Sequence, residues 1–221
     1  GEPTPPYEPT TQYQAREIEG WTVLVNKGLL AGQPDLADRT LALLGHQLFQ
    51  VAWRVPPGPL AKLRTMHIWV EETSQNPCMT YHPSVDWLRE HGMNPEKARC
   101  VELANARNFL KWAEDQPWMV LHELAHGYHD QFIEGGFENP DIHAAFRHAK
   151  AAGLFESVLT ATGRQGQAYA ARNPKEYFAE SSEAFFGTND FYPFVRPELR
   201  KHDPGMAELL QRLWELPRAD R

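Results

Sequence analysis

Several features that assign a protein to a broad class are missing from this 221-residue sequence. No apolar run approaches the roughly 18 residues of a membrane-spanning helix, so we expect no membrane span. No block of Lys and Arg interrupts the mixed charges, whose sum is −7, so nucleic acid is not expected as a partner. No charged and apolar leader opens the chain, which indicates either a cytosolic protein or a signal peptide already removed.

Cysteine is scarce, because Cys78 and Cys100 are the only two. Their spacing matches no C-x-x-C or other metal-binding pattern. A disulfide between them would stabilise the fold by roughly 3 kcal/mol in the loop-entropy view. Two unrelated buried thiols are the alternative. We expect the disulfide and therefore an exported protein, secreted or periplasmic.

The residues that are present are enough for one large domain. Apolar residues make up 42% of the chain, with 7 Trp and 11 Phe, which allows a sizeable core. Residues 1–16 are rich in Pro and Thr and nearly free of aliphatic side chains, which predicts an extended or disordered arm. Residues 17–221 are expected to form a single domain, and no oligomeric state is predicted.

The most informative stretch is 118–129, which contains the His-Glu-x-x-His pattern of zinc hydrolases at His122, Glu123 and His126. On a helix, positions i and i+4 share one face, so both imidazoles can approach one zinc at about 2.0–2.1 Å. Glu123 would flank the metal and take a proton from water that zinc activates. The apolar neighbours predict a buried helix over 117–133, carrying one zinc per chain.

A hydrolytic zinc site needs a third protein ligand, for which Glu176 is the preferred candidate. It lies near the start of an amphipathic helix predicted for 174–187. Glu180, one turn later, could accept a hydrogen bond from a zinc-binding imidazole and fix its tautomer. His129 and Glu183 remain alternative ligands. The glutamates of this helix could also form only a solvated acidic face.

This pattern resembles the catalytic domain of the anthrax lethal-factor-type metallopeptidases, a gluzincin group. The resemblance covers about 117–187 and depends on the His-Glu-x-x-His motif, the run Glu-Tyr-Phe-Ala-Glu at 176–180, and Tyr169 seven residues before that run. It implies hydrolysis of a peptide or protein substrate. It also implies a set of roles: zinc ligands His122, His126 and Glu176, general base Glu123, and oxyanion stabiliser Tyr169.

The fold class predicted from these elements is α+β. Strands are expected near 21–25, 65–72 and 100–105, and further helices over about 34–53, 141–152 and 206–216. The expected architecture is a zincin-like domain, with a small mixed sheet packed on the zinc helix and a mostly helical C-terminal half.

The strand before the zinc helix is assigned to substrate by analogy with zincins. Val101, Leu103 and Asn105 alternate along it, and an extended peptide could add to its edge. A zinc-dependent peptidase is therefore the predicted function. The alternative is a non-catalytic zinc-binding scaffold. The presence of Glu123 and Tyr169 disfavours it, because only catalysis needs these two residues. A deformylase-type enzyme is disfavoured, because Val-Glu rather than Leu follows Cys100.

Overall fold

A five-stranded mixed sheet forms the N-terminal part of residues 6–217, which the computed structural model describes. Its spatial order is β1-β2-β3-β5-β4, with β1/β2 and β4/β5 antiparallel and β2/β3 and β3/β5 parallel. The predicted α+β class and small mixed sheet are confirmed. The strands are β1 (Tyr13–Ile18), β2 (Trp21–Asn26), β3 (Ile68–Val70), β4 (Met79–Tyr81) and β5 (Val101–Leu103), with a separate pair β6 (Val158–Leu159) and β7 (Gln165–Gly166).

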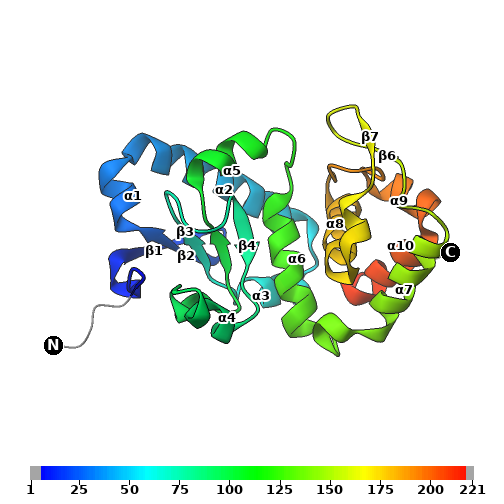
Figure 1. Ribbon diagram of the computed structural model, residues 1–221, viewed down its shortest axis with the longest axis horizontal. Coiled ribbons are helices and arrows are strands. Elements are labelled where there is room, and N and C mark those ends of the chain that lie inside the picture. Colours follow the sequence, from blue (N-terminus) through cyan, green and yellow to red (C-terminus); the bar gives the residue numbers. More distant parts are fainter. Residues whose placement is uncertain (1–5, 218–221) are drawn as a thin grey trace.

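Helices make up most of the C-terminal half, as predicted. Figure 1 shows α6 between the sheet and α8, with α7, α9 and α10 beyond α8. Within residues 6–217, no helix has the length and apolar character needed to cross a membrane. The helices are α1 (Lys27–Gly32), α2 (Pro34–Arg54), α3 (Pro57–Leu63), α4 (Val85–Glu90), α5 (Ala106–Trp112), α6 (Met119–Phe132), α7 (Pro140–Ala151), α8 (Pro174–Phe186), α9 (Arg196–His202) and α10 (Pro204–Leu213).

Helix α6 carries the His-Glu-x-x-His motif and packs directly on the sheet layer. A Cβ atom at Gly127 would lie 2.2 Å from the Met66 sulfur and 3.0 Å from the Tyr81 ring. The absence of a side chain at Gly127 therefore lets this layer approach the α6 backbone. Its fully buried apolar residues are Val120, Leu121, Leu124 and Ala125.

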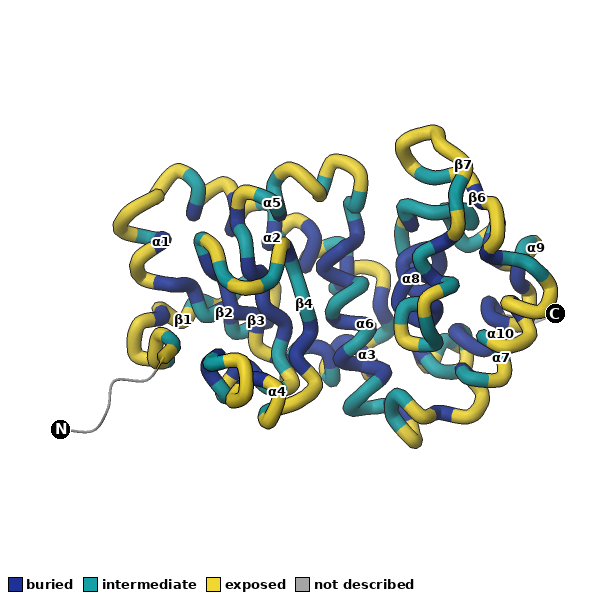
Figure 2. Tube along the Cα trace, viewed as in Figure 1, coloured by how far each residue is buried: buried dark blue, intermediate teal, exposed yellow. Residues whose placement is uncertain are grey.

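Trp214, which follows α10, packs against both α6 and α8. Its ring stacks on Tyr128 of α6 at a centroid distance of 4.1 Å and on Phe178 of α8 at 5.9 Å. Its indole nitrogen donates a 3.0 Å hydrogen bond to the Ser182 hydroxyl of α8. Figure 2 shows α8 buried along most of its length. This packing holds the two helices at a fixed separation.

The predicted N-terminal arm includes residues 13–16, which lie in β1. The β1–β2 connection is a two-residue turn, in which Glu19 and Gly20 both have positive φ, at 51° and 87°. This conformation matches the twist of antiparallel strands. Of the two conformations predicted for the arm, extended or disordered, residues 13–16 adopt the extended one and belong to the sheet. Residues 1–5 lie outside the described residues, and the division into arm and single domain stays a prediction.

The strand predicted as a substrate edge is internal. β5 pairs with β3 on one side and β4 on the other, so Val101 and Leu103 are fully buried. Asn105 lies beyond β5 and caps α5 by accepting a hydrogen bond from the Asn108 amide. The assignment of Val101, Leu103 and Asn105 to the substrate edge is wrong, because β4 returns to cover β5. The free edge on this side belongs to β4.

The predicted disulfide is also wrong, because Cys78 and Cys100 are both free thiols. Cys78 pairs with Ala104 in the β4–β5 ladder, while Cys100 precedes Ala104 by four residues. Four residues of strand span about 13 Å, whereas bridged Cα atoms lie about 4.4–6.8 Å apart. Burial and the nearby Glu123 charge raise the pKa of the Cys78 thiol to about 12. Export, which depended on the disulfide, stays an untested prediction.

Candidate metal centre

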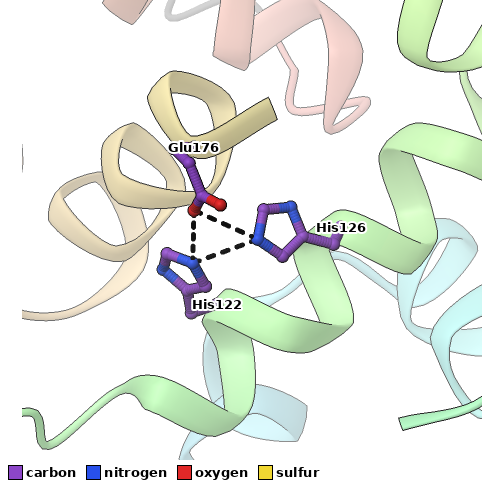
Figure 3. Close-up of side chains that lie close together, drawn as sticks. All are labelled: His122, His126 and Glu176. Atoms are coloured by element: carbon purple, nitrogen blue, oxygen red, sulfur yellow. Dashed lines mark hydrogen bonds and ion pairs between the residues drawn. The ribbon is translucent and has the colours of Figure 1, made fainter. Parts of the chain in front are cut away.

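Three side chains converge between two neighbouring helices, α6 and α8. His122 and His126 project from α6, and Glu176 projects from the first turn of α8 (Figure 3). The His122 and His126 Nε2 atoms are 3.1 Å apart. Glu176 Oε2 lies 3.0 Å from the first nitrogen and 3.3 Å from the second. The structure thus brings together the three ligands predicted from the sequence.

The spacing of these three atoms suits a tetrahedral zinc ion. Donors about 2.0–2.1 Å from a tetrahedral metal are about 3.3 Å from one another. The observed separations of 3.0–3.3 Å are close to that value. Two imidazole nitrogens and one carboxylate oxygen are also donors that zinc accepts in catalytic sites. His122, His126 and Glu176 therefore fit a zinc ion as a group.

The start of α8 fixes the position of Glu176. Pro174 occupies the first turn, where a missing amide proton costs nothing. The Asn173 side chain accepts hydrogen bonds of 3.0 Å from the amides of Lys175 and Glu176, which caps the helix. Glu176 consequently lies in a capped, rigid first turn that faces α6.

Glu183, rather than Glu180, makes the hydrogen bond to the outer nitrogen of His122. Glu183 Oε1 is 2.6 Å from His122 Nδ1, whereas Glu180 Oε1 is 3.6 Å away, beyond hydrogen-bond range. An ionised carboxylate only accepts, so Nδ1 donates to Glu183, and Nε2 is the nitrogen that would be available to a metal ion. The role predicted for Glu180 is thus filled by Glu183, which the sequence had suggested only as an alternative ligand.

The histidine and the glutamates of this cluster alter one another's pKa values. Burial opposes a charge on His122, but its hydrogen bonds to Glu176 and Glu183 raise its pKa. Burial also opposes the charge on Glu176, yet the two histidines hold its pKa well below the usual range. Burial raises the pKa of Glu180 and of Glu183. A positive charge placed in this cluster would favour the ionised form of each of these carboxylates.

Glu123 lies beside the three ligand candidates and is not among them. Its Oε2 accepts a 2.8 Å hydrogen bond from the Tyr81 backbone amide of β4. That contact anchors the carboxylate to the edge strand. Glu123 also lines both cavities next to the centre, where it can reach a bound molecule.

Tyr169 begins a short 3-10 turn, Tyr169–Arg172, and lines the same two cavities. Its ring centroid is 6.4 Å from that of His122. Arg172 donates a 2.9 Å hydrogen bond to the phenol oxygen and stacks on the ring at 4.0 Å. Because Arg172 uses the oxygen as an acceptor, the phenol proton is free to point elsewhere. Burial and the Glu176 charge raise the pKa of Tyr169, which keeps that proton in place.

Two cavities flank the centre and share Met79, His122, Glu123 and Tyr169. One, of about 340 Å³, extends toward Trp112. The other, of about 270 Å³, extends toward Lys175. Together they form a cleft that passes the metal centre on both sides, with edge strand β4 along it.

His129, the other alternative ligand, is directed away from the centre. It is fully buried between Phe137 and Phe178, whose ring centroids lie 5.1 Å and 4.9 Å away. Among the described residues, neither of its ring nitrogens has a hydrogen-bond partner. Burial and nearby His126 lower its pKa to about 3. It is a neutral core residue.

The comparisons with known proteins give one structural similarity. No family model and no curated protein sequence matches the chain. The Pro-Pro endopeptidase PPEP-2 from Paenibacillus alvei has a similar solved structure, with a TM-score of 0.45 and 16% identity. The match covers 80% of this chain and 90% of that one. A similarity of this extent does not assign the chain to a family.

Proposed function

We propose that this protein is a zinc-dependent peptidase. The observation that carries the proposal is the triangle of His122 Nε2, His126 Nε2 and Glu176 Oε2, with the Glu123 carboxylate beside it in an open cleft. A zinc ion held by these donors would supply Lewis acidity to a scissile carbonyl and would lower the pKa of the attacking water to about 7. One ion per chain is expected.

Glu123 acts as the general base in this proposal. The Tyr81 amide holds its Oε2, which leaves Oε1 to take the proton of the attacking water. The same carboxylate then delivers the proton to the leaving amine as the peptide bond breaks. A base of this kind contributes about 10²–10⁴-fold to the rate.

Tyr169 stabilises the charge that develops on the carbonyl oxygen. Arg172 occupies a lone pair of the phenol oxygen and positions the ring, so the phenol proton can be donated to the oxyanion. Donors of this kind contribute about 10²–10³-fold to turnover.

The edge strand β4 provides a place for an extended peptide. Within residues 6–217 it pairs with β5 on one side and with no strand on the other, and Met79 of this strand lines both cavities. A peptide that adds to β4 as a further strand would cross the metal centre. The substrate edge is therefore reassigned from β5 to β4.

The test combines metal content with digestion of a mixed peptide library. Wild-type protein is expected to hold one zinc and to cleave peptides, whereas Glu176→Ala loses zinc and His129→Ala retains it. Glu123→Gln should keep zinc and fold but cleave about 10²–10⁴-fold more slowly. If zinc-loaded wild type cleaves nothing across a broad library, a non-catalytic zinc-binding scaffold replaces the peptidase proposal.

A further inference from the structure

The larger cavity beside the metal centre combines carboxylates with aromatic walls. Glu180 and Glu183 of α8 and Asp190 of the following loop all line it, together with Trp112 and Phe191. Its volume of about 340 Å³ falls within the usual range of ligand pockets, about 300–1,000 Å³.

Among the described residues, His122 is the one cationic partner of the carboxylates of this cavity, and it is shared between Glu183 at 2.6 Å and Glu180 at 3.6 Å. Glu183 is hydrogen-bonded to His122. Glu180 is only 4% exposed, and its Oε2 has no hydrogen-bond partner among residues 6–217. Over the same residues, no lysine or arginine forms an ion pair with Glu180, Glu183 or Asp190. A buried carboxylate without a partner is costly, so the cavity favours a cationic occupant.

We infer that this cavity is a specificity subsite for the basic side chain, lysine or arginine, of a residue next to the scissile bond. The inference depends on the proposed peptidase function, because it names the substrate class of the same centre. Asp190 and Glu180 receive the cationic head, while Trp112 and Phe191 contact the aliphatic stem.

The shape and charge of the cavity both suit such a side chain. Lysine and arginine carry a long apolar stem with a cationic tip, and the stem packs on aromatic surfaces while the tip finds carboxylates. The second cavity differs, because a lysine, Lys175, lines it together with Glu176. The excess of acidic side chains is therefore confined to the cavity that extends toward Trp112. The two cavities should consequently select different substrate side chains.

A second metal ion is a less suitable occupant than a basic side chain. Donor atoms of His122, Glu180 and Glu183 do lie close enough together to hold a metal ion. However, His122 Nδ1 already donates a proton to Glu183 at 2.6 Å, and a metal there would require that proton to leave. A lysine or arginine needs no such change, since it donates to carboxylate oxygens directly.

The first test is a set of matched peptides cleaved by zinc-loaded wild type. Arginine is placed in turn at each position around the cleaved bond and compared with citrulline, its neutral isostere. At one position adjoining the bond, arginine should raise kcat/KM by about 10- to 100-fold over citrulline. Equal rates for the two residues at every position would overturn the subsite while leaving the peptidase function intact.

The second test removes one charge from the cavity. The Asp190 carboxylate makes no hydrogen bond to another side chain among the described residues, so Asp190→Asn should preserve the fold. It should reduce the ratio of kcat/KM for arginine peptides to kcat/KM for citrulline peptides by about tenfold. The matched control is Glu114→Gln, an exposed charge after α5 that does not line the cavity, and it should keep the full preference.

A binding measurement keeps the inference testable without turnover. Labelled arginine and citrulline peptides are titrated onto zinc-loaded Glu123→Gln by fluorescence anisotropy, with and without Asp190→Asn. Tighter binding of the arginine peptide, lost in the double variant, supports the subsite even if no peptide is cleaved. Equal binding of both peptides, or two zinc ions per chain with the second lost in Glu180→Gln, would overturn it.

Discussion

The hydrogen bond between Glu183 and His122 gives a sharp prediction about metal affinity. Glu183→Gln should weaken zinc binding, whereas Glu180→Gln should have little effect. The contrast follows from the distances of the two carboxylates to His122 Nδ1, which are 2.6 Å and 3.6 Å. Only the shorter one lies in hydrogen-bond range, so only Glu183 fixes the tautomer that leaves Nε2 free for the metal.

The expected size of the effect follows from the kind of hydrogen bond. A bond to an ionised partner contributes about 1.5–3 kcal/mol, and each 1.4 kcal/mol is a factor of about ten in affinity. Glutamine keeps an acceptor oxygen but removes the charge. We therefore expect zinc to bind about 10- to 100-fold more weakly to Glu183→Gln, in line with other partners of metal-binding histidines.

The assay is zinc titration against a chelator of known affinity, with thermal unfolding of the metal-free proteins alongside. Metal-free Glu183→Gln should be no less stable than wild type, because burial raises the pKa of both Glu180 and Glu183 and the change removes one of two crowded carboxylates. Weaker zinc binding in Glu180→Gln with unchanged binding in Glu183→Gln would refute the assignment of the tautomer to Glu183.

Three predictions concern stability elsewhere in the fold. Lys97→Met should destabilise the protein by about 3–5 kcal/mol in denaturant titrations, because the buried lysine pairs with Glu71 at 2.8 Å and Glu102 at 2.7 Å. His129→Leu should keep zinc and raise stability by about 2 kcal/mol more at pH 5 than at neutral pH. The sign follows because the folded pKa of about 3 is below the unfolded one, so acid protonates the unfolded chain first. Gly127→Ala should cost about 1–3 kcal/mol by overpacking, measured by thermal unfolding, although alanine ordinarily favours a helix.

The motif and its helix could be predicted because their signals are local. The spacing of His122 and His126, together with apolar neighbours, determines both the helix and the face on which the imidazoles lie. The same holds for α8, where Pro174 and a capping Asn173 precede Glu176. Each of these elements is specified within about fifteen residues of sequence.

The errors arose where the answer depends on pairing between distant segments. β4 is only three residues long, which is too short for a periodic pattern of apolar residues to indicate it. Its place at the sheet edge depends on its antiparallel pairing with β5, which follows it in the sequence. The composition of β1 does not indicate a strand, because most of its residues are polar and exposed or half-buried. A signal for it did exist, because Glu19-Gly20 between two short runs is a hairpin turn sequence, with glycine suited to positive φ.

The choice between Glu180 and Glu183 shows why the geometry of the candidate metal site is harder to predict than its motif. Both residues lie on α8 and both approach His122, so sequence spacing alone does not decide which one is closer. The decision depends on how α8 lies against α6, and Trp214 sets this by stacking on Tyr128 and bonding Ser182. A tryptophan near the end of the chain thus positions a carboxylate that it never touches. The residue types of the centre can be predicted from the motif, while their relative positions depend on packing between Tyr128 and Trp214, which are separated by about two fifths of the sequence.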